Sequence, residues 1–234
     1  MVGDMRKNLI VIGFMVIAAM MTACYEGEFA VQDEQGQVIE SVAWPEGNVY
    51  YRIEGFDAND ENDQYTLKMI KLAMQEWSGA GNVQFIEKPE GGGYVCRIVK
   101  SENNSSTIGY RKNPLIYLQS NASQRQATHE LGHLLGFTHE HQRPDRDQYI
   151  TVLWSNIRPE AAGQYQIMDT TLYDVTDYAY DYRSVMHYST SSGTVSAWKK
   201  TYTINDASYN EWWPTYLTET DRQKVRDIYG DRAE

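Results

Sequence analysis

The stretch that most constrains this chain is "THELGHLLGFTHEHQRPDRD", residues 128–147, which holds four of the five histidines among 234 residues. Residues four apart share one face of a helix, so His129 and His133 lie one turn apart and can reach the same ion. Gly136 follows three residues later and can adopt the left-handed conformation that ends a helix. The chain can then turn back and bring His139 to the same point. The spacing therefore predicts a helix, a sharp turn and a metal site.

Glu130 makes a catalytic zinc the favoured interpretation of this site. It is rotated by about 100° from His129, so it lies beside the ion without being a ligand and can act on a bound water. An amphipathic helix with Leu131, Leu134 and Leu135 in the core would explain the leucines but leave polar rings buried. A structural zinc normally has four Cys or His ligands, which would give Glu130 no role. We expect one zinc ion per chain.

Composition limits the class of protein. The length suits one large domain with an ample core, and 41% hydrophobic residues with 18 Tyr and 6 Trp exclude disorder. A formal net charge of -11 argues against nucleic acid as a partner, because phosphate backbones attract clustered Lys and Arg. We expect a monomer that does not bind nucleic acid.

The N-terminus is typical of a targeting segment. Residues 1–23 contain Arg6 and Lys7 and then thirteen apolar or small residues, too short a run to span a bilayer comfortably. The residues "MTAC" that end at Cys24 resemble the lipobox of bacterial lipoproteins, although Met21 stands where Leu, Val or Ile is usual. We therefore expect a lipoprotein-type signal peptide, with an uncleaved anchor as the alternative. The protein would be exported by a bacterium, either secreted or held at the outer membrane or cell surface.

The two cysteines leave a choice open. Cys24 is a lipid acceptor, a thiolate that blocks the zinc, or the disulfide partner of Cys96. The adjoining apolar run favours lipidation, which would leave Cys96 as a small buried hydrophobic residue. Residues 24–43 are polar and acidic, and they are interpreted as a prosegment or linker.

Periodicity and turn residues predict a sheet-and-helix first half and a loop-rich second half closed by one helix. The helix through the histidines should begin at a cap on Ser123 or Asn121, and the last helix should begin at Thr218, with Asp221 in a capping box, and stop at Gly230. The stretch 149–157 predicts a strand or a short helix, and 165–183 looks irregular. Strands are expected at 48–53, 83–88, 94–99 and 115–119, and a further helix at 60–80.

The histidine stretch, continued by Glu140 and the run from Arg143 to Asp147, resembles the astacin family of metzincin zinc metalloendopeptidases. "YDYRSVMHY", residues 180–188, is similar to the Met-turn of that family. The likeness extends from Trp44 to the C-terminal helix, so residues 44–234 are expected to be catalytic domain. It implies an α+β, zincin-like, two-lobed domain in which a twisted mixed sheet and the active-site helix lie above an irregular C-terminal lobe.

The resemblance also implies roles for single residues. His129, His133 and His139 would bind zinc, and Glu130 would be general base and then general acid. Met186 would form a hydrophobic floor under the metal, and Tyr188 would bind zinc at rest and then stabilise the oxyanion. Glu140 would engage the mature N-terminus. His141 and His187 match no ligand position and are interpreted as structural or surface residues.

The resemblance further implies an endopeptidase that hydrolyses extracellular proteins through a zinc-bound water activated by Glu130. "YEGE", residues 25–28, is similar to the prosegment motif that blocks zinc with a carboxylate, which would make Glu28 a latency residue and the protein a zymogen. An ordinary acidic linker is the alternative. The family often favours acidic side chains after the scissile bond, and Arg183, Lys199 and Lys200 are candidates for the matching basic group. The rival interpretations are a metallohydrolase for another substrate class and a non-enzymatic binder with a vestigial site.

Overall fold

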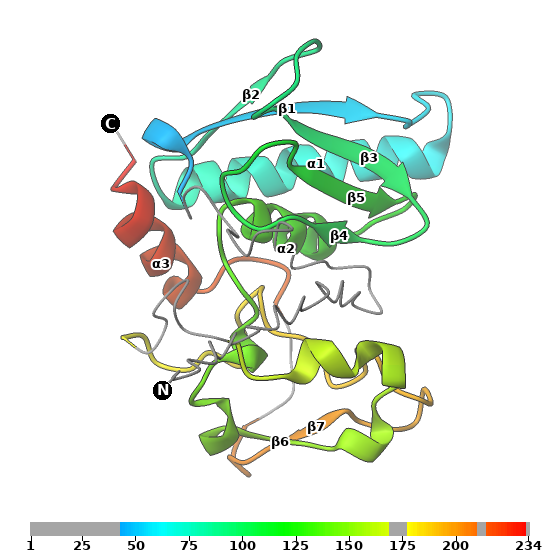
Figure 1. Ribbon diagram of the computed structural model, residues 1–234, viewed down its shortest axis with the longest axis vertical. Helices are drawn as coiled ribbons and strands as arrows, with labels where there is room; N and C mark the ends of the chain where they lie inside the picture. Colours follow the sequence, from blue (N-terminus) through cyan, green and yellow to red (C-terminus); the bar gives the residue numbers. More distant parts are fainter. Residues whose placement is uncertain (1–42, 169–176, 210–213, 233–234) are drawn as a thin grey trace, which may run out of the picture.

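The computed structural model describes residues 43–168, 177–209 and 214–232. The expected signal peptide, Cys24, Glu28 and nearly all of the linker lie outside the described residues. Within them the chain forms an upper lobe, built from a sheet and two helices, and a lower lobe of short elements (Figure 1). The α+β, two-lobed architecture expected from the sequence is confirmed.

The upper lobe is organised by a five-stranded mixed sheet in the order β2-β1-β3-β5-β4. The strands β1, β2, β3 and β5 pair in parallel, and the short β4 pairs antiparallel with β5. The sequence did not predict β4, and β3 begins two residues later than expected. The strands are β1 (Asn48–Glu54), β2 (Gln84–Glu87), β3 (Cys96–Ser101), β4 (Ser105–Ser106) and β5 (Leu115–Gln119).

Two helices cover one face of this sheet, α1 (Glu61–Ala80) and α2 (Gln124–Leu134) (Figure 1). Asp60 caps α1 by accepting a hydrogen bond from the backbone N–H of Asp63. The fully buried Trp77 of α1 stacks on Phe137 and donates from Nε1 to the carbonyl of Thr128 at 2.8 Å. Trp77 thus ties α1 to α2 and to the chain that follows α2. Among the described residues no helix is long and apolar enough to cross a membrane.

The start of α2 follows the sequence closely. Ser123 forms a full capping box with Gln126, whereas Asn121, the alternative cap, precedes it at φ 66°. The helix ends at Leu134, two residues before the predicted stop. Gly136 then takes a φ of 98°, which a residue with a Cβ rarely adopts.

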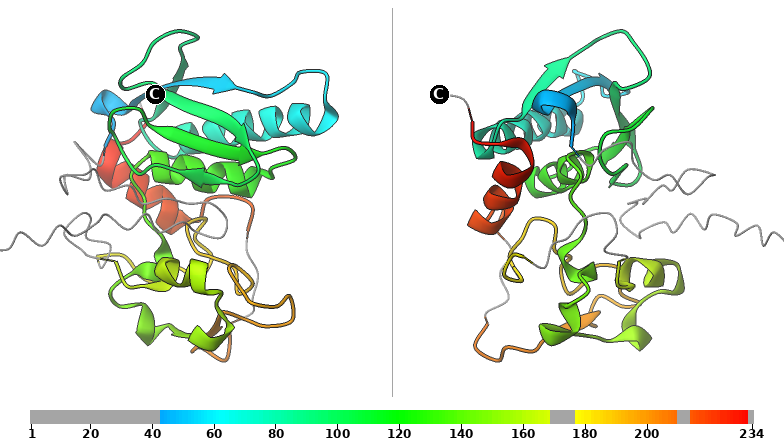
Figure 2. Two further views of the ribbon diagram at one scale, coloured as in Figure 1. Left: turned by 45° about the vertical axis from the view of Figure 1, so that its right-hand side comes forward. Right: turned by 60° about the vertical axis from the view of Figure 1, so that its left-hand side comes forward.

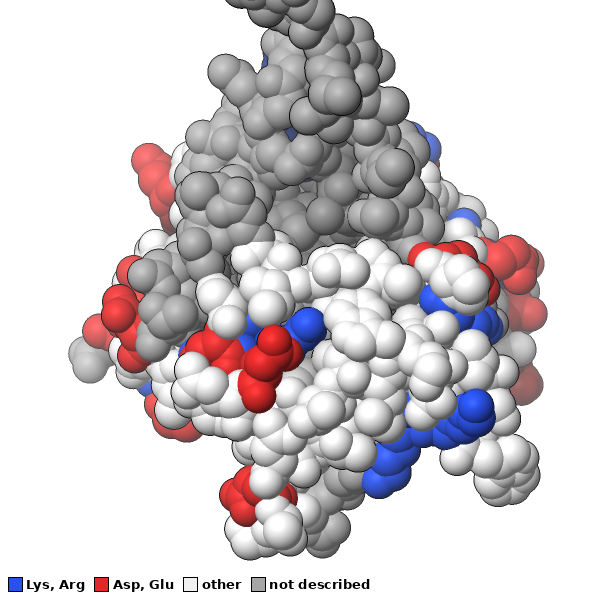
Figure 3. Space-filling model, turned by 60° about the horizontal axis from the view of Figure 1, so that its bottom comes forward, with Lys and Arg blue, Asp and Glu red and all other residues white. Residues whose placement is uncertain are grey.

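The lower lobe contains a two-stranded antiparallel pair, β6 (Ile150–Val152) and β7 (Tyr202–Ile204), and several short 3-10 helices. The stretch for which the sequence allowed a strand or a helix holds both, β6 and a 3-10 turn at Trp154–Asn156. A second, tyrosine-rich core includes Tyr165, Tyr180, Tyr188 and Tyr202. Seen from below, the described surface is mostly uncharged, with separate small groups of basic and acidic side chains (Figure 3).

The last helix, α3 (Glu219–Tyr229), returns to the upper lobe and packs against α1 (Figure 2). Thr218 and Asp221 form the predicted capping box, and Gly230 takes a φ of 83° after the last turn. Tyr229 donates from its hydroxyl to the carbonyl of Leu135 at 2.8 Å, and the indole of Trp44 donates to Leu134 at 2.7 Å. The first and last described segments therefore meet at the end of α2.

Candidate metal centre and active site

Three buried histidines converge at the end of α2, as the spacing predicts. One ring nitrogen each of His129, His133 and His139 lies within 4.8 Å of the other two. The reversal that brings His139 back depends on Gly136, whose N–H donates to the carbonyl of His133 at 2.8 Å. Among the described residues, no other group of His, Cys, Asp or Glu comes together in this way.

Each of these rings is oriented through its Nδ1. The partner of Nδ1 is the carbonyl of Val185 for His129 and the carbonyl of Phe137 for His133, both at 2.7 Å. For His139 it is the side-chain oxygen of Gln142 at 2.6 Å. Because these oxygens only accept hydrogen bonds, Nδ1 carries the proton, and the lone pair of Nε2 is available to a metal.

The geometry fits one zinc ion. The Nε2 atoms of His133 and His139 are 3.2 Å apart, and with both protons on Nδ1 two lone pairs face each other. Two nitrogens that each lie at about 2.0–2.1 Å from a tetrahedral zinc would be separated by roughly 3.3 Å. Among the described residues no Cys, Asp, Glu or further His joins the three imidazoles, and such a three-histidine set is typical of catalytic rather than structural zinc sites.

A cavity of about 260 Å³ opens beside His129. Glu130 is 2% exposed and lines this cavity together with His129 and Tyr188. The arrangement places a carboxylate next to the metal position without making it a ligand, as the 100° rotation on the helix predicts. The role of Glu130 as a proton carrier remains a prediction at this point.

Met186 packs against α2 at a position where the helix has no side chain. A Cβ added to Gly132 would lie 2.5 Å from the Met186 sulfur and 3.0 Å from the Trp77 ring. Gly132, between two of the histidines, is thus the residue that admits the methionine. The need for glycine at this position was not evident from the sequence, because the side chain that a Cβ would clash with, Met186, lies 54 positions away.

Tyr188 is buried at the edge of the metal centre. Its ring centroid lies 4.5 Å from that of His139 and 6.3 Å from that of His129. Burial raises the pKa of its phenol well above the ordinary value, so the hydroxyl keeps its proton at neutral pH. The site therefore has a neutral hydrogen-bond donor close to its histidines.

The other two histidines support this tyrosine and are not at the surface. His141 stacks on Tyr188 with centroids 4.2 Å apart, and its Nε2 donates to the carbonyl of Gln164 at 2.9 Å. His187 donates from Nδ1 to the carbonyl of Tyr188 at 2.8 Å and accepts from the Tyr180 hydroxyl at 2.7 Å. Burial lowers the pKa of His187 to about 4, so this ring is neutral.

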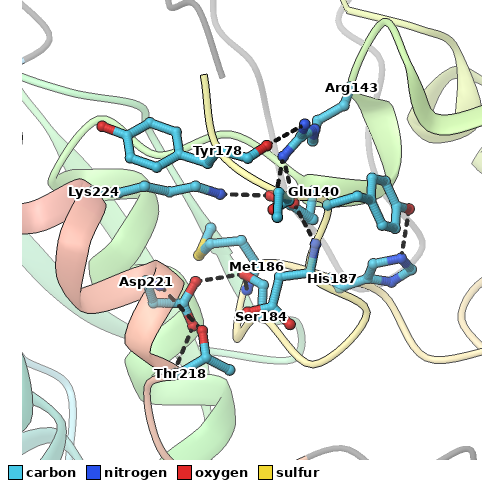
Figure 4. Close-up of polar contacts among 12 residues, drawn as sticks. Glu140, Arg143, Tyr178, Ser184, Met186, His187, Thr218, Asp221 and Lys224 are labelled. Atoms are coloured by element: carbon cyan, nitrogen blue, oxygen red, sulfur yellow. Dashed lines mark hydrogen bonds and ion pairs between the residues drawn. The ribbon is translucent and has the colours of Figure 1, made fainter. Parts of the chain in front are cut away.

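Helix α3 holds the Met-turn from the other side. Asp221 accepts hydrogen bonds from the Ser184 hydroxyl at 2.6 Å and from the Val185 N–H at 3.0 Å (Figure 4). Burial raises the pKa of this carboxyl group above its ordinary value. The carbonyl of the same Val185 accepts a hydrogen bond from His129 Nδ1. Asp221 is therefore linked to a metal-site histidine through Val185. The sequence had assigned Asp221 only to a helix cap.

Glu140 is engaged within the chain. Its Oε1 accepts from Arg143 and from the Asp181 N–H, both at 2.9 Å, and its Oε2 accepts from the Lys224 ammonium at 2.7 Å (Figure 4). The expectation that Glu140 engages the mature N-terminus concerns residues outside the described ranges. Among those that are described, the cations on Glu140 are Arg143 and Lys224.

The basic residue in the wall of the cavity is Arg125, not one of the three proposed from the sequence. Arg183, Lys199 and Lys200 are absent from the lining, whereas Arg125 is part of it. The Arg125 guanidinium donates to the carbonyls of Pro214 at 2.6 Å and His187 at 3.1 Å. Arg125 thus connects the Met-turn with the segment at Pro214 while it brings a positive charge to the cavity.

Cys96 lies in the core of the upper lobe, away from this site. It is fully buried and free of a disulfide within the described residues, and burial raises the pKa of its thiol. A disulfide with Cys24, one of the three alternatives that the sequence leaves open, is not tested, because Cys24 lies outside the described residues.

The sequence of this chain is similar to those of known peptidases. The sequence model of the Astacin peptidase family matches residues 37–230. Astacin-like metalloprotease toxin 2 of Loxosceles intermedia is 30% identical over 87% of this chain and 82% of its own length. Human Tolloid-like protein 1 is 30% identical over 69% of this chain, which spans only 16% of that relative.

Solved structures agree on the fold. High choriolytic enzyme 1, a hatching enzyme zinc-protease of medaka (Oryzias latipes), has a TM-score of 0.69 at 22% identity, over 79% of this chain and 90% of that one. Myroilysin has a TM-score of 0.51 at 22% identity, over 81% and 86% of the two chains.

Proposed function

Because the chain belongs to the astacin family of peptidases and is a zinc metalloendopeptidase, we propose that it cleaves extracellular proteins with Glu130 as proton carrier. The observation that carries the proposal is the convergence of three Nδ1-oriented histidines, one of which, His129, lines a cavity together with Glu130 and Tyr188. The zinc cofactor and a protein or peptide substrate follow from family membership. The roles of individual residues and the extracellular location of the substrates are our proposal.

His129, His133 and His139 hold the zinc in this proposal. The chemistry that bound zinc supplies is Lewis acidity, which makes water acidic enough to lose a proton near neutral pH and polarises a carbonyl group. The protein fixes the three rings beforehand, through hydrogen bonds to Val185 O, Phe137 O and Gln142 Oε1. Such partners set ring orientation and strengthen the ligands.

Glu130 moves the proton. It takes one proton from the attacking water while the new C–O bond forms at the peptide carbonyl, and it gives that proton to the amide nitrogen as the C–N bond breaks. Its position in the cavity wall, 2% exposed, keeps bulk water from competing for the carboxylate. The proton count balances over one turnover.

Tyr188 stabilises the negative charge that develops on the carbonyl oxygen. Its phenolic hydroxyl can donate a hydrogen bond, and its ring lies next to those of His139 and His129. A donor placed where charge develops is worth roughly 10²- to 10³-fold in rate at comparable sites. The stacked His141 ring holds this phenol in the cavity wall.

The substrate is proposed to bind in extended form alongside β4. This strand forms the edge of the sheet, and Asn104, which directly precedes it, lines the cavity with Glu130. Edge strands bind extended peptides through backbone hydrogen bonds. Arg125 gives the same cavity a positive charge, which favours acidic or neutral side chains in the peptide.

The test is hydrolysis of unfolded casein by the chain from Gln35 onward, beside its Glu130→Ala variant at equal zinc loading. We expect the wild type to cleave and the variant to be inactive while it retains one zinc. If neither cleaves and both hold zinc, the site is retained for binding, and the non-enzymatic interpretation replaces this one.

We further propose that residues 1–23 direct export, that Cys24 is the lipid attachment site, and that Glu28 keeps the tethered protein latent. The apolar run before Cys24 and the acidic "YEGE" stretch support this proposal. Mass spectrometry of the N-terminal peptide tests the lipid, and casein hydrolysis by the membrane fraction tests latency. Full-length, membrane-bound protein with undiminished activity would count against the role of Glu28.

A further inference from the structure

Lys224 is a buried cation that the reaction described above does not use. It lies on α3 with its side chain 5% exposed, and its ammonium is 2.7 Å from the equally buried carboxylate of Glu140. Taking both charges out of water carries a desolvation cost that such a pair often fails to offset. A hydrophobic pair of similar size would serve packing at least as well. The pair therefore calls for a role other than packing.

Glu140 is held rigidly by this contact. Lys224 donates to Oε2, while Arg143 and the N–H of Asp181 donate to Oε1 (Figure 4). Hydrogen bonds therefore fix the position of both carboxylate oxygens. The backbone of Glu140 is fixed too, because its N–H donates to the carbonyl of Met186 at 3.0 Å. Side chain and main chain of this residue are both anchored.

Glu140 leads directly to a metal-site histidine. It follows His139 in the chain and opens the 3-10 turn Glu140–Gln142. The side chain of Gln142, at the end of that turn, accepts the hydrogen bond from His139 Nδ1 at 2.6 Å. Any movement of Glu140 therefore shifts both the backbone of His139 and the group that orients its ring.

We infer that Lys224 is a positioning residue for the metal centre, which fixes the turn that carries His139 by holding the Glu140 carboxylate with a cation from α3. The same helix fixes His129 through Asp221 and Val185. Two of the three histidines thus depend on α3, although α3 contributes no residue to the cavity lining.

The test is zinc affinity of the full chain, measured by competition with a chelating dye, for the wild type and Lys224→Met. We expect the dissociation constant for zinc to rise about tenfold, at the lower end of the effect of outer-shell substitutions. The matched control is Arg226→Met, which breaks a more exposed ion pair with Glu219 on the same helix. It should leave zinc affinity unchanged.

The double variant Glu140→Gln/Lys224→Met separates positioning from charge balance. We expect it to regain part of the thermal stability lost in Lys224→Met, because no charged Oε2 is left buried without its ammonium partner, but not the zinc affinity. Unchanged zinc affinity in Lys224→Met, with a lower melting temperature alone, would overturn the inference, as would full recovery of affinity in the double variant. If Lys224→Met does not fold, Lys224→Gln, which keeps a donor without charge, replaces it with the same two outcomes.

One consequence of the inference rests on the proposed function. In Lys224→Met, kcat should fall and KM should stay constant. Zinc affinity is measured without substrate. A wild type that binds zinc but cleaves nothing would therefore defeat the proposed function and leave the role of Lys224 to be decided by the affinities.

Discussion

The carbonyl oxygen of Val185 accepts a hydrogen bond from Nδ1 of His129 at 2.7 Å, across 56 residues of sequence. This contact joins the Met-turn to the metal centre. Val185 also donates its N–H to Asp221, so one residue connects α3 to a metal-site histidine. The segment before Met186 therefore orients a histidine while the methionine itself packs beneath α2.

Removing the Tyr188 hydroxyl should slow catalysis and leave the metal in place. Tyr188→Phe keeps the ring that packs on His139 and His141 but removes the donor. We expect kcat on a peptide substrate to fall by about 10²-fold or more with little change in KM. Steady-state kinetics at equal zinc loading check this. The control is Tyr216→Phe, at a tyrosine that is 62% exposed. Equal kcat in Tyr188→Phe and wild type would exclude the oxyanion role.

A methyl group at Gly132 should disturb the methionine floor. Gly132→Ala places a Cβ 2.5 Å from the Met186 sulfur, so the side chain or the helix must shift. We expect unfolding free energy to fall by about 1–3 kcal/mol and zinc affinity to weaken. Urea denaturation and dye competition measure the two effects.

The matched control for that change is Gly79→Ala on α1, where an added Cβ meets nothing within 4 Å. This variant should gain about 0.5–1 kcal/mol through helix propensity. If both alanine variants proved more stable than the wild type, the packing of Met186 against Gly132 would be looser than the structure indicates.

His187 should make stability fall in mild acid. Its pKa is lowered from 6.5 to about 4 by burial, so below pH 6.5 the unfolded chain binds a proton that the folded chain does not. Stability from this residue is complete above pH 6.5 and is lost as the pH falls towards 4. Between pH 7 and pH 5 the loss should be about 2 kcal/mol.

The comparison variant for this pH effect is His187→Gln, whose amide can donate to Tyr188 O and accept from the Tyr180 hydroxyl. Urea unfolding of both proteins at pH 7 and pH 5 isolates the contribution of the imidazole from that of the carboxylates. Equal pH dependence in the two proteins would show that His187 titrates normally.

Zinc removal should destabilise the folded chain. A ligand that binds only the folded state adds about 2.7 kcal/mol at a concentration 100 times its dissociation constant. Chelation should therefore lower the melting temperature, and readdition of zinc should restore it. In His133→Ala, which loses one of the converging nitrogens, most of the zinc-dependent shift should vanish. A shift of wild-type size in that variant would place the stabilising zinc elsewhere.

The sequence predicted those features that depend on neighbours in the chain. The spacing of His129, His133 and Gly136 predicted the helix and its reversal, and Ser123 and Thr218 predicted two helix starts, because caps and turns are local. Four of the five strands of the sheet were placed within one or two residues, and β4 was not predicted. The family resemblance supplied the two-lobed fold.

What the sequence did not reveal depends on contacts between distant residues. Lys224 meets Glu140 across 84 positions, and Asp221 meets Val185 across 36. No periodicity marks such pairs, since a lysine on an amphipathic helix is usually solvated. Arg125 was missed for the same reason, because its carbonyl partners come from segments 59 to 89 residues later.

The position of α3 in the chain order has a consequence for synthesis. Ribosomes extend a protein from its N-terminus, and domains fold as their residues emerge. His129, His133 and His139 emerge some 80 to 100 residues ahead of Asp221 and Lys224, which hold two of them in place. A nascent chain lacking α3 would carry all three histidines and Glu130 without the contacts that align them. The hydrolytic centre is therefore completed late, so a partly made protease is poorly equipped to cut its neighbours.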